Sequence, residues 1–89
     1  MLARRYLVEG RVQGVGFRYF VSRVAHSFGV LGWVKNLKNG IVEIRAQGDE
    51  EVLTRFKAEI RSGSPFAIVE NIREDDIQIE TYENFFIER

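Results

Sequence analysis

The stretch from Gly10 to Arg18 reads Gly-Arg-Val-Gln-Gly-Val-Gly-Phe-Arg and links two segments of different periodicity. Before it, apolar residues alternate with polar ones, which is typical of a half-buried strand. After it, apolar residues recur at the three- and four-residue spacing of an amphipathic helix. Gly14 and Gly16 allow the connecting backbone to curl tightly. The sequence therefore predicts a strand, a short glycine-rich loop and a helix that begins near Phe17.

A loop of this kind can bind a tetrahedral anion. The first amides of a helix have no intrahelical partners and lie at the positive end of its dipole, and a curled loop brings further N–H groups to the same point. Arg18 adds a planar fork of charged donors, and a bound anion would offset the unfavourable position of an Arg at a helix start. On this hypothesis the anion-binding residues are Gln13, Gly14, Val15, Gly16, Phe17 and Arg18. The alternative is an ordinary glycine-rich turn followed by a solvated Arg.

The rest of the chain predicts an alternation of strands and helices. The first helix should end at Gly29. The pair Asn39-Gly40 favours a tight hairpin, Asp49 can cap a second helix, and Ser62-Gly63-Ser64-Pro65 ends that helix. The expected strands cover residues 6–12, 31–36, 41–47, 67–73 and 77–81, the last of them continuing towards 85–87.

This order, β-α-β-β-α-β plus a C-terminal strand, predicts an α+β fold, the ferredoxin-like split βαβ sandwich with a mostly antiparallel sheet backed by two helices. We expect a single domain over residues 1–89. Strands joined by a helical crossover run parallel, so their C-terminal ends meet at one edge of the sheet. Asn36 ends the second such strand and should therefore lie close to the loop. An Asn at this point is commonly a turn former, so the residues alone leave its role open.

The composition excludes several classes of function. The chain has no Cys, which removes disulfides, thiolate catalysis and thiolate metal sites. No stretch approaches the roughly 20 apolar residues of a membrane span, and the first residues lack the apolar core of a signal peptide, so we expect a cytoplasmic protein with no membrane partner. The net charge is zero, with basic residues in excess over 1–45 and acidic residues over 46–89. This distribution favours a small anion at the loop and disfavours a nucleic acid.

The remaining titratable residues indicate no metal site. His26 is the only His and lies on a predicted helix, without the partners that a metal site or a catalytic triad requires. The cluster Asp49-Glu50-Glu51 suits the start of a helix, and Glu74-Asp75-Asp76 suits a solvated turn. We therefore expect a structural role for His26 and no metal.

Two motifs together resemble the signatures of the acylphosphatase family, whose members are small hydrolases that cleave carboxyl-phosphate mixed anhydrides. The first motif is the run from Gly10 to Arg18. The second is Gly32-Trp33-Val34-Lys35-Asn36, followed by Asn39-Gly40 and Val42-Glu43, and both occur in the family's order and spacing. The resemblance extends over nearly all 89 residues. It departs at Gly63-Ser64-Pro65, where the family commonly has Gly-Pro-Pro, and this turn is expected to lie away from the loop.

The resemblance implies a monomeric enzyme that converts an acyl phosphate and water to a carboxylate and inorganic phosphate, without metal or cofactor. It assigns phosphate binding to Arg18 and the loop, and the positioning of the attacking water to Asn36. Two other functions are compatible with the fold: a non-catalytic phosphate-binding or regulatory acylphosphatase-like domain, and an RNA-binding ferredoxin-like domain. The presence of both Arg18 and Asn36 disfavours the first. The neutral net charge and the absence of an RNP-like string disfavour the second.

Overall fold

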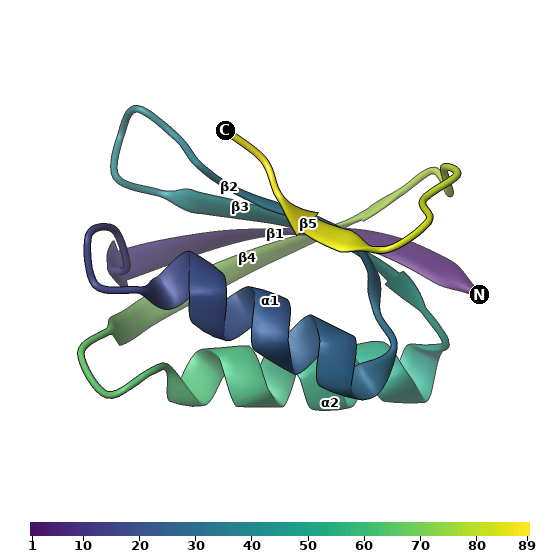
Figure 1. Ribbon diagram of the computed structural model, residues 1–89, viewed down its shortest axis with the longest axis horizontal. Helices are drawn as coiled ribbons and strands as arrows, with labels where there is room; N and C mark the ends of the chain where they lie inside the picture. The colour runs from purple at the N-terminus through teal and green to yellow at the C-terminus, as the bar shows by residue number, and fades with distance from the viewer.

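One five-stranded sheet carries both helices on the same face (Figure 1). The computed structural model describes residues 1–89. Its elements in chain order are β1 (Leu2–Arg11), α1 (Phe17–Phe28), β2 (Leu31–Asn36), β3 (Val42–Gly48), α2 (Glu50–Ser62), β4 (Ile68–Ile77) and β5 (Phe85–Ile87). This is the predicted β-α-β-β-α-β order with a C-terminal strand, so the ferredoxin-like α+β class is confirmed.

The strand order across the sheet is β4-β1-β3-β2-β5. Strand β3 lies between β1 and β2 and pairs antiparallel with both, so that Ile44 is opposite Tyr6 on one side and Val34 on the other. Strands β1 and β2 therefore run in the same direction, as the crossover through α1 requires. β4 adds antiparallel to the outer side of β1, and β5 adds parallel to β2. The C-terminal ends of β1 and β2 consequently lie at one edge of the sheet.

The core lies between the sheet and the two helices. Helix α1 buries Phe17, Val21 and Ala25 at helical spacing, and Gly29 ends it in the left-handed conformation. On α2 the buried stripe is Leu53, Phe56 and Ile60. The ring of Phe56 packs between Tyr6 of β1, at 6.2 Å between ring centroids, and Phe85 of β5, at 6.4 Å. Neither helix has the length and apolar character needed to traverse a lipid bilayer.

The strand predicted over residues 77–81 is wrong. Strand β4 continues to Ile77, residues 78–84 form no strand, and only Phe85–Ile87 pair with β2. The physical reason is Gln47, which is buried near the end of β3. Its amide nitrogen donates to the Glu80 carbonyl oxygen at 2.8 Å, and its carbonyl oxygen accepts from the Glu80 amide. A side chain therefore satisfies the backbone groups of Glu80 that a neighbouring strand would otherwise use.

The acidic run at residues 74–76 is not the solvated turn that its composition suggested. It lies within β4, directly opposite β1, where Arg4 and Arg5 face it. The Arg4 Nε atom lies 3.6 Å from a Glu74 carboxylate oxygen and 3.5 Å from one of Asp76. Arg5 donates to Asp75 at 2.9 Å. Cross-strand ion pairing thus allows three consecutive acidic residues to occupy a strand.

Candidate active site

The loop between β1 and α1 adopts the tight curl that its glycines permit. Gly14 has a φ of 74° and Gly16 a φ of 78°, both in the left-handed region that disfavours residues with a side chain. A Cβ atom added at either glycine would meet no other atom within 4 Å. The requirement for glycine here therefore comes from the backbone conformation and not from lack of space.

The start of α1 is open to a ligand. Gly16 occupies the N-cap position, no side chain caps the helix, and its first turn contains no acidic residue. The N–H groups of the first turn consequently have no capping acceptor, and the positive end of the helix dipole is not offset by a carboxylate. An anion at this point would supply both a hydrogen-bond acceptor for these N–H groups and a negative charge at the positive end of the dipole.

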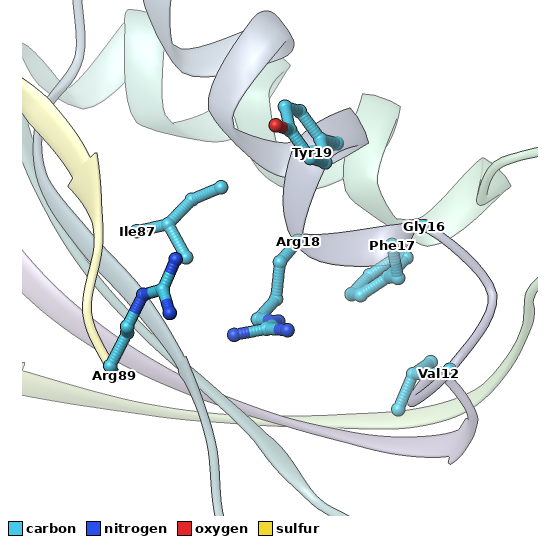
Figure 2. Close-up of a pocket in the computed structure, with 8 residues that line it drawn as sticks. Val12, Gly16, Phe17, Arg18, Tyr19, Ile87 and Arg89 are labelled. Carbon is cyan, nitrogen blue, oxygen red and sulfur yellow. The ribbon is translucent and has the colours of Figure 1, made fainter.

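A cavity of about 350 Å³ lies against this helix start. Figure 2 shows the Arg18 side chain extending from α1 into the cavity, with Val12 and Phe17 on one side and Ile87 and Arg89 on the other. The lining contains two guanidinium groups and no Asp or Glu side chain, and consists of Val12, Gly14, Gly16, Phe17, Arg18, Tyr19, Ile87 and Arg89. Its electrostatics therefore favour an anionic ligand.

Arg18 is available to that ligand. Its side chain is half-buried, and it takes part in none of the ion pairs of the molecule, whose cations are Arg4, Arg5, Arg45, Lys57 and the N-terminal amine. An unpaired guanidinium at an uncapped helix start can form charge-assisted hydrogen bonds to a phosphoryl group.

Gln13 ties the loop to the β2–β3 hairpin. Its side-chain nitrogen donates to the Leu37 carbonyl oxygen at 2.8 Å and to the Ile41 carbonyl oxygen at 3.0 Å. The loop therefore lies directly beside the turn that follows Asn36, which is the proximity expected from two parallel strands. The side-chain nitrogen of Gln13 is used for this contact, so its backbone N–H is the group that remains for a ligand.

Asn36 ends β2 opposite Val42, and its side chain carries an unsatisfied acceptor. The Oδ1 atom is buried and has no hydrogen-bond partner. Asn39, three residues later, behaves differently: its Oδ1 accepts from the backbone N–H of Ile41 at 3.1 Å, which is ordinary turn chemistry. The structure thus separates the two asparagines of the hairpin, one closing the turn and one left without a partner.

Not every predicted residue lines the cavity. Gly14, Gly16, Phe17 and Arg18 do, whereas Gln13 and Asn36 lie outside its lining. Val15 faces a separate groove that also contains Gly14 of the loop and Pro65 of the turn after α2, with Arg11, Phe66 and Ile68. The turn at residues 63–65 therefore borders the loop, and the expectation that it lies away from the loop is wrong.

Ile87 and Arg89 also line the cavity, and the sequence did not predict this. They lie near the opposite end of the chain and reach the cavity because β5 pairs with β2, placing Ile87 opposite Val34. No local pattern around Arg89 indicates this. Only the pairing of the short apolar segment 85–87 with β2 could have revealed it. His26, in contrast, has the expected structural position, with Nε2 3.0 Å from the Phe85 carbonyl oxygen.

Comparisons with known proteins identify relatives of this chain. The family model for acylphosphatases matches residues 4–87. An acylphosphatase of Thermotoga maritima is 51% identical over 87 residues, covering 98% of this chain and 97% of the relative. An acylphosphatase of Archaeoglobus fulgidus is 47% identical over 85 residues, covering 96% of each chain.

Solved structures show the same likeness. The crystal structure of acylphosphatase from Bacillus subtilis superposes with a TM-score of 0.97 at 44% identity, covering 100% of both chains. A structure of full-length HypF in its phosphate- and nucleotide-bound form superposes with a TM-score of 0.92 at 30% identity. That match covers 99% of this chain but only 12% of the HypF chain.

Proposed function

The chain belongs to the acylphosphatase family and hydrolyses acyl phosphates, and from this premise we propose how its residues divide the work of the reaction. Water attacks the phosphorus of an acyl phosphate, the bond from phosphorus to the acyl oxygen breaks, and a carboxylate and inorganic phosphate are formed. The backbone N–H groups of the loop from Gln13 to Arg18, together with the Arg18 guanidinium, bind the phosphoryl oxygens. They also stabilise the charge on those oxygens in the transition state.

The observation that carries this proposal is the position of Arg18. Its guanidinium extends into a cavity that no Asp or Glu side chain lines, beside a helix start that no side chain caps (Figure 2). Phosphoryl transfer needs little covalent help from a protein, and positioning together with electrostatic stabilisation supplies most of the catalysis. A fixed cation and a set of converging amides meet that requirement.

We propose that Asn36 holds the attacking water. Its Oδ1 atom is a buried acceptor without a partner, and such groups are uncommon enough in proteins to require an explanation. The amide oxygen can accept from the water while the amide nitrogen donates to a phosphoryl oxygen, and the group carries no charge that would repel the substrate. The leaving carboxylate is stable, so no strong general acid is needed, and the substrate's own phosphoryl oxygen can take the proton of the water.

Three further proposals rest on the sequence: the chain acts as one domain over residues 1–89, as a monomer in the cytoplasm, and without metal or cofactor. An assay with an aryl acyl phosphate, with and without EDTA, tests the last of them. We expect equal rates in the two arms. A strict requirement for an added divalent cation would contradict the metal-free mechanism.

Replacing Arg18 tests the phosphate-binding role. Arg18 should contact the phosphoryl group both in the bound substrate and in the transition state, so Arg18→Ala should raise KM and lower kcat together. Inhibition by inorganic phosphate should weaken in parallel. Arg23→Ala removes an Arg from the same helix that does not line the cavity, and it should leave all three quantities unchanged. Retention of phosphate inhibition in Arg18→Ala would place the anion elsewhere.

Replacing Asn36 tests the water-positioning role. Asn36→Ala should lower kcat by about 100-fold or more while KM and the phosphate inhibition constant change little, because a group that orients the nucleophile acts mainly on the chemical step. Asn39→Ala is the matched control, since it removes the turn-forming asparagine of the same hairpin. It should reduce stability and leave kcat near normal. A folded Asn36→Ala enzyme with normal kcat would return Asn36 to the role of a turn residue.

A further inference from the structure

Gln13 does not line the cavity. Its side chain instead forms two hydrogen bonds to backbone groups that are distant in the sequence. Both donors of its amide nitrogen are used, one on the Leu37 carbonyl oxygen at 2.8 Å and one on the Ile41 carbonyl oxygen at 3.0 Å. The acceptors lie 24 and 28 residues along the chain. Gln13 thus uses both of its side-chain donors on the hairpin, and only its backbone N–H remains for a substrate.

Leu37, the residue that follows Asn36, is held through both its backbone N–H and its carbonyl group. The N–H group of Leu37 donates to the Ile41 carbonyl oxygen at 2.8 Å, and the Leu37 carbonyl accepts from Gln13. The Ile41 carbonyl accepts from Leu37 and from Gln13 at once. The backbone that carries the Asn36 side chain is therefore anchored to the loop and not only to its own hairpin.

No backbone ladder provides the same link. Strand β3 separates β1 from β2, so the loop after β1 and the turn after β2 belong to strands that do not pair. None of the backbone hydrogen bonds outside the helices and strands joins residues 12–16 to residues 37–41. The distance between the anion-binding loop and Asn36 therefore depends on side-chain contacts, among which the two bonds of Gln13 are direct.

We propose that Gln13 is a positioning residue for hydrolysis: it holds the β2–β3 hairpin against the loop so that Asn36 presents the water to a phosphoryl group bound at Arg18. The inference rests on the function proposed above for Asn36. A displacement of about 1 Å in a group that orients a reactant can cost about 100-fold in rate. Phosphate binding itself depends on the loop amides and on Arg18, so loss of the Gln13 side chain should spare it.

The test compares two glutamines whose side chains each form two hydrogen bonds to distant backbone groups. Gln47 also bridges distant backbone groups with its side-chain amide, but it does so near the end of β3, opposite Leu31 at the start of β2. Gln13→Met and Gln47→Met keep the length of the side chain and remove its hydrogen bonds. Both variants should unfold at lower temperature than the parent. Only Gln13→Met should lose kcat, by about tenfold or more, with KM and the phosphate inhibition constant within about twofold of the parent.

A double variant shows whether Gln13 acts through Asn36. If it does, Gln13→Met should cause little further loss of kcat in an enzyme that already carries Asn36→Ala, because the group being positioned is gone. Independent losses that multiply would overturn the proposal, as would a normal kcat in folded Gln13→Met. If Gln13→Met fails to fold, Gln13→Glu replaces it in the test. The Glu carboxylate repels the two carbonyl oxygens at neutral pH, but when protonated it can donate to one of them. The kcat of Gln13→Glu relative to the parent should therefore rise as the pH falls.

The outcomes also distinguish the proposed role of Asn36 from the proposed role of Gln13. Normal kcat in Asn36→Ala would remove the proposed function of Asn36 and this inference with it. A collapse of kcat in Asn36→Ala together with normal kcat in Gln13→Met would remove only the inference.

Discussion

Individual glycines in this chain meet two different physical needs. Gly16 needs freedom of the backbone, since its left-handed conformation starts α1 and an added Cβ atom would point into open space. Gly32 needs space as well, because a Cβ atom there would overlap the carbonyl oxygen of Arg45 on the paired strand. The first glycine shapes the loop, and the second allows β2 and β3 to approach.

The contrast predicts unequal costs of adding one methyl group. Gly16→Ala should lower the free energy of unfolding by about 1–2 kcal/mol, the cost of holding an L-residue in the left-handed region. Gly32→Ala combines that strain with a backbone overlap, and it should destabilise the protein by several times as much or prevent folding. Urea unfolding of the two variants measures the difference. Equal stabilities would contradict the close approach at Gly32.

At the same scale, the residues that the sequence could identify are those whose partners are local. The loop could be predicted because its glycines, the helix start and Arg18 are contiguous in the sequence. The position of Asn36 near the loop could be predicted because strands joined by a helical crossover run parallel. Arg89 was not predictable, because its position in the cavity depends on the pairing of β5 with β2. The hydrogen bonds of Gln13 were also invisible, since the acceptors are backbone carbonyls, which every residue possesses.

Among the elements, the two helices and the β2–β3 hairpin could be located in the sequence from periodicity and turn residues. The segment after β4 could not, because Ile77 to Thr81 has the alternation of a strand, yet only Ile77 pairs with a neighbouring strand, opposite Ala3 of β1. Gln47 binds the backbone of Glu80 instead, and the chain resumes pairing only at Phe85. Strand propensity describes the segment alone, whereas strand formation depends on an available neighbour.

The attachment of α2 to the sheet depends on Phe56. Its ring lies between Tyr6 and Phe85 and is fully buried. Phe56→Ala should therefore lower the free energy of unfolding by about 3–5 kcal/mol, the usual cost of removing a buried aromatic ring and leaving a cavity. Phe66→Ala removes a ring that is 76% exposed and should change stability by no more than about 0.5 kcal/mol. Similar costs in urea unfolding would contradict the core position of Phe56.

For the molecule as a whole, stability should depend on alkaline pH through Tyr6. The pKa of Tyr6 is raised from its ordinary 10.0 to about 12, chiefly by burial and also by the negative charge of Glu74, while Arg4 partly opposes the shift. Between these two values the unfolded chain releases the phenolic proton and the folded chain retains it, so the free energy of unfolding falls as the pH rises. The maximum slope is about 1.4 kcal/mol per pH unit.

Urea unfolding between pH 9 and pH 12 measures this dependence. Tyr6→Phe has no phenol to titrate, so the parent should lose more stability than the variant across this range. At pH 7 the substitution should cost little, because the Tyr6 hydroxyl is buried without a hydrogen-bond partner. Parallel curves for the two proteins would show that Tyr6 titrates alike in the folded and unfolded states.

The insertion of β3 between β1 and β2 has a consequence for the order of events during folding. The loop and the hairpin turn that form the candidate site lie before and after α1 and β2 in the sequence. They are aligned by the pairing of β3 with β1, in which Leu2 lies opposite Gly48. Such non-local pairing requires closure of a long loop and forms late relative to local helix and hairpin contacts. A half-assembled intermediate would contain α1, the loop before it and the β2–β3 hairpin, without the alignment of the loop with the hairpin. Recovered enzyme activity therefore reports the last step of refolding. Partly ordered chains have no activity, although a spectroscopic measurement of helix content would include them with the folded protein.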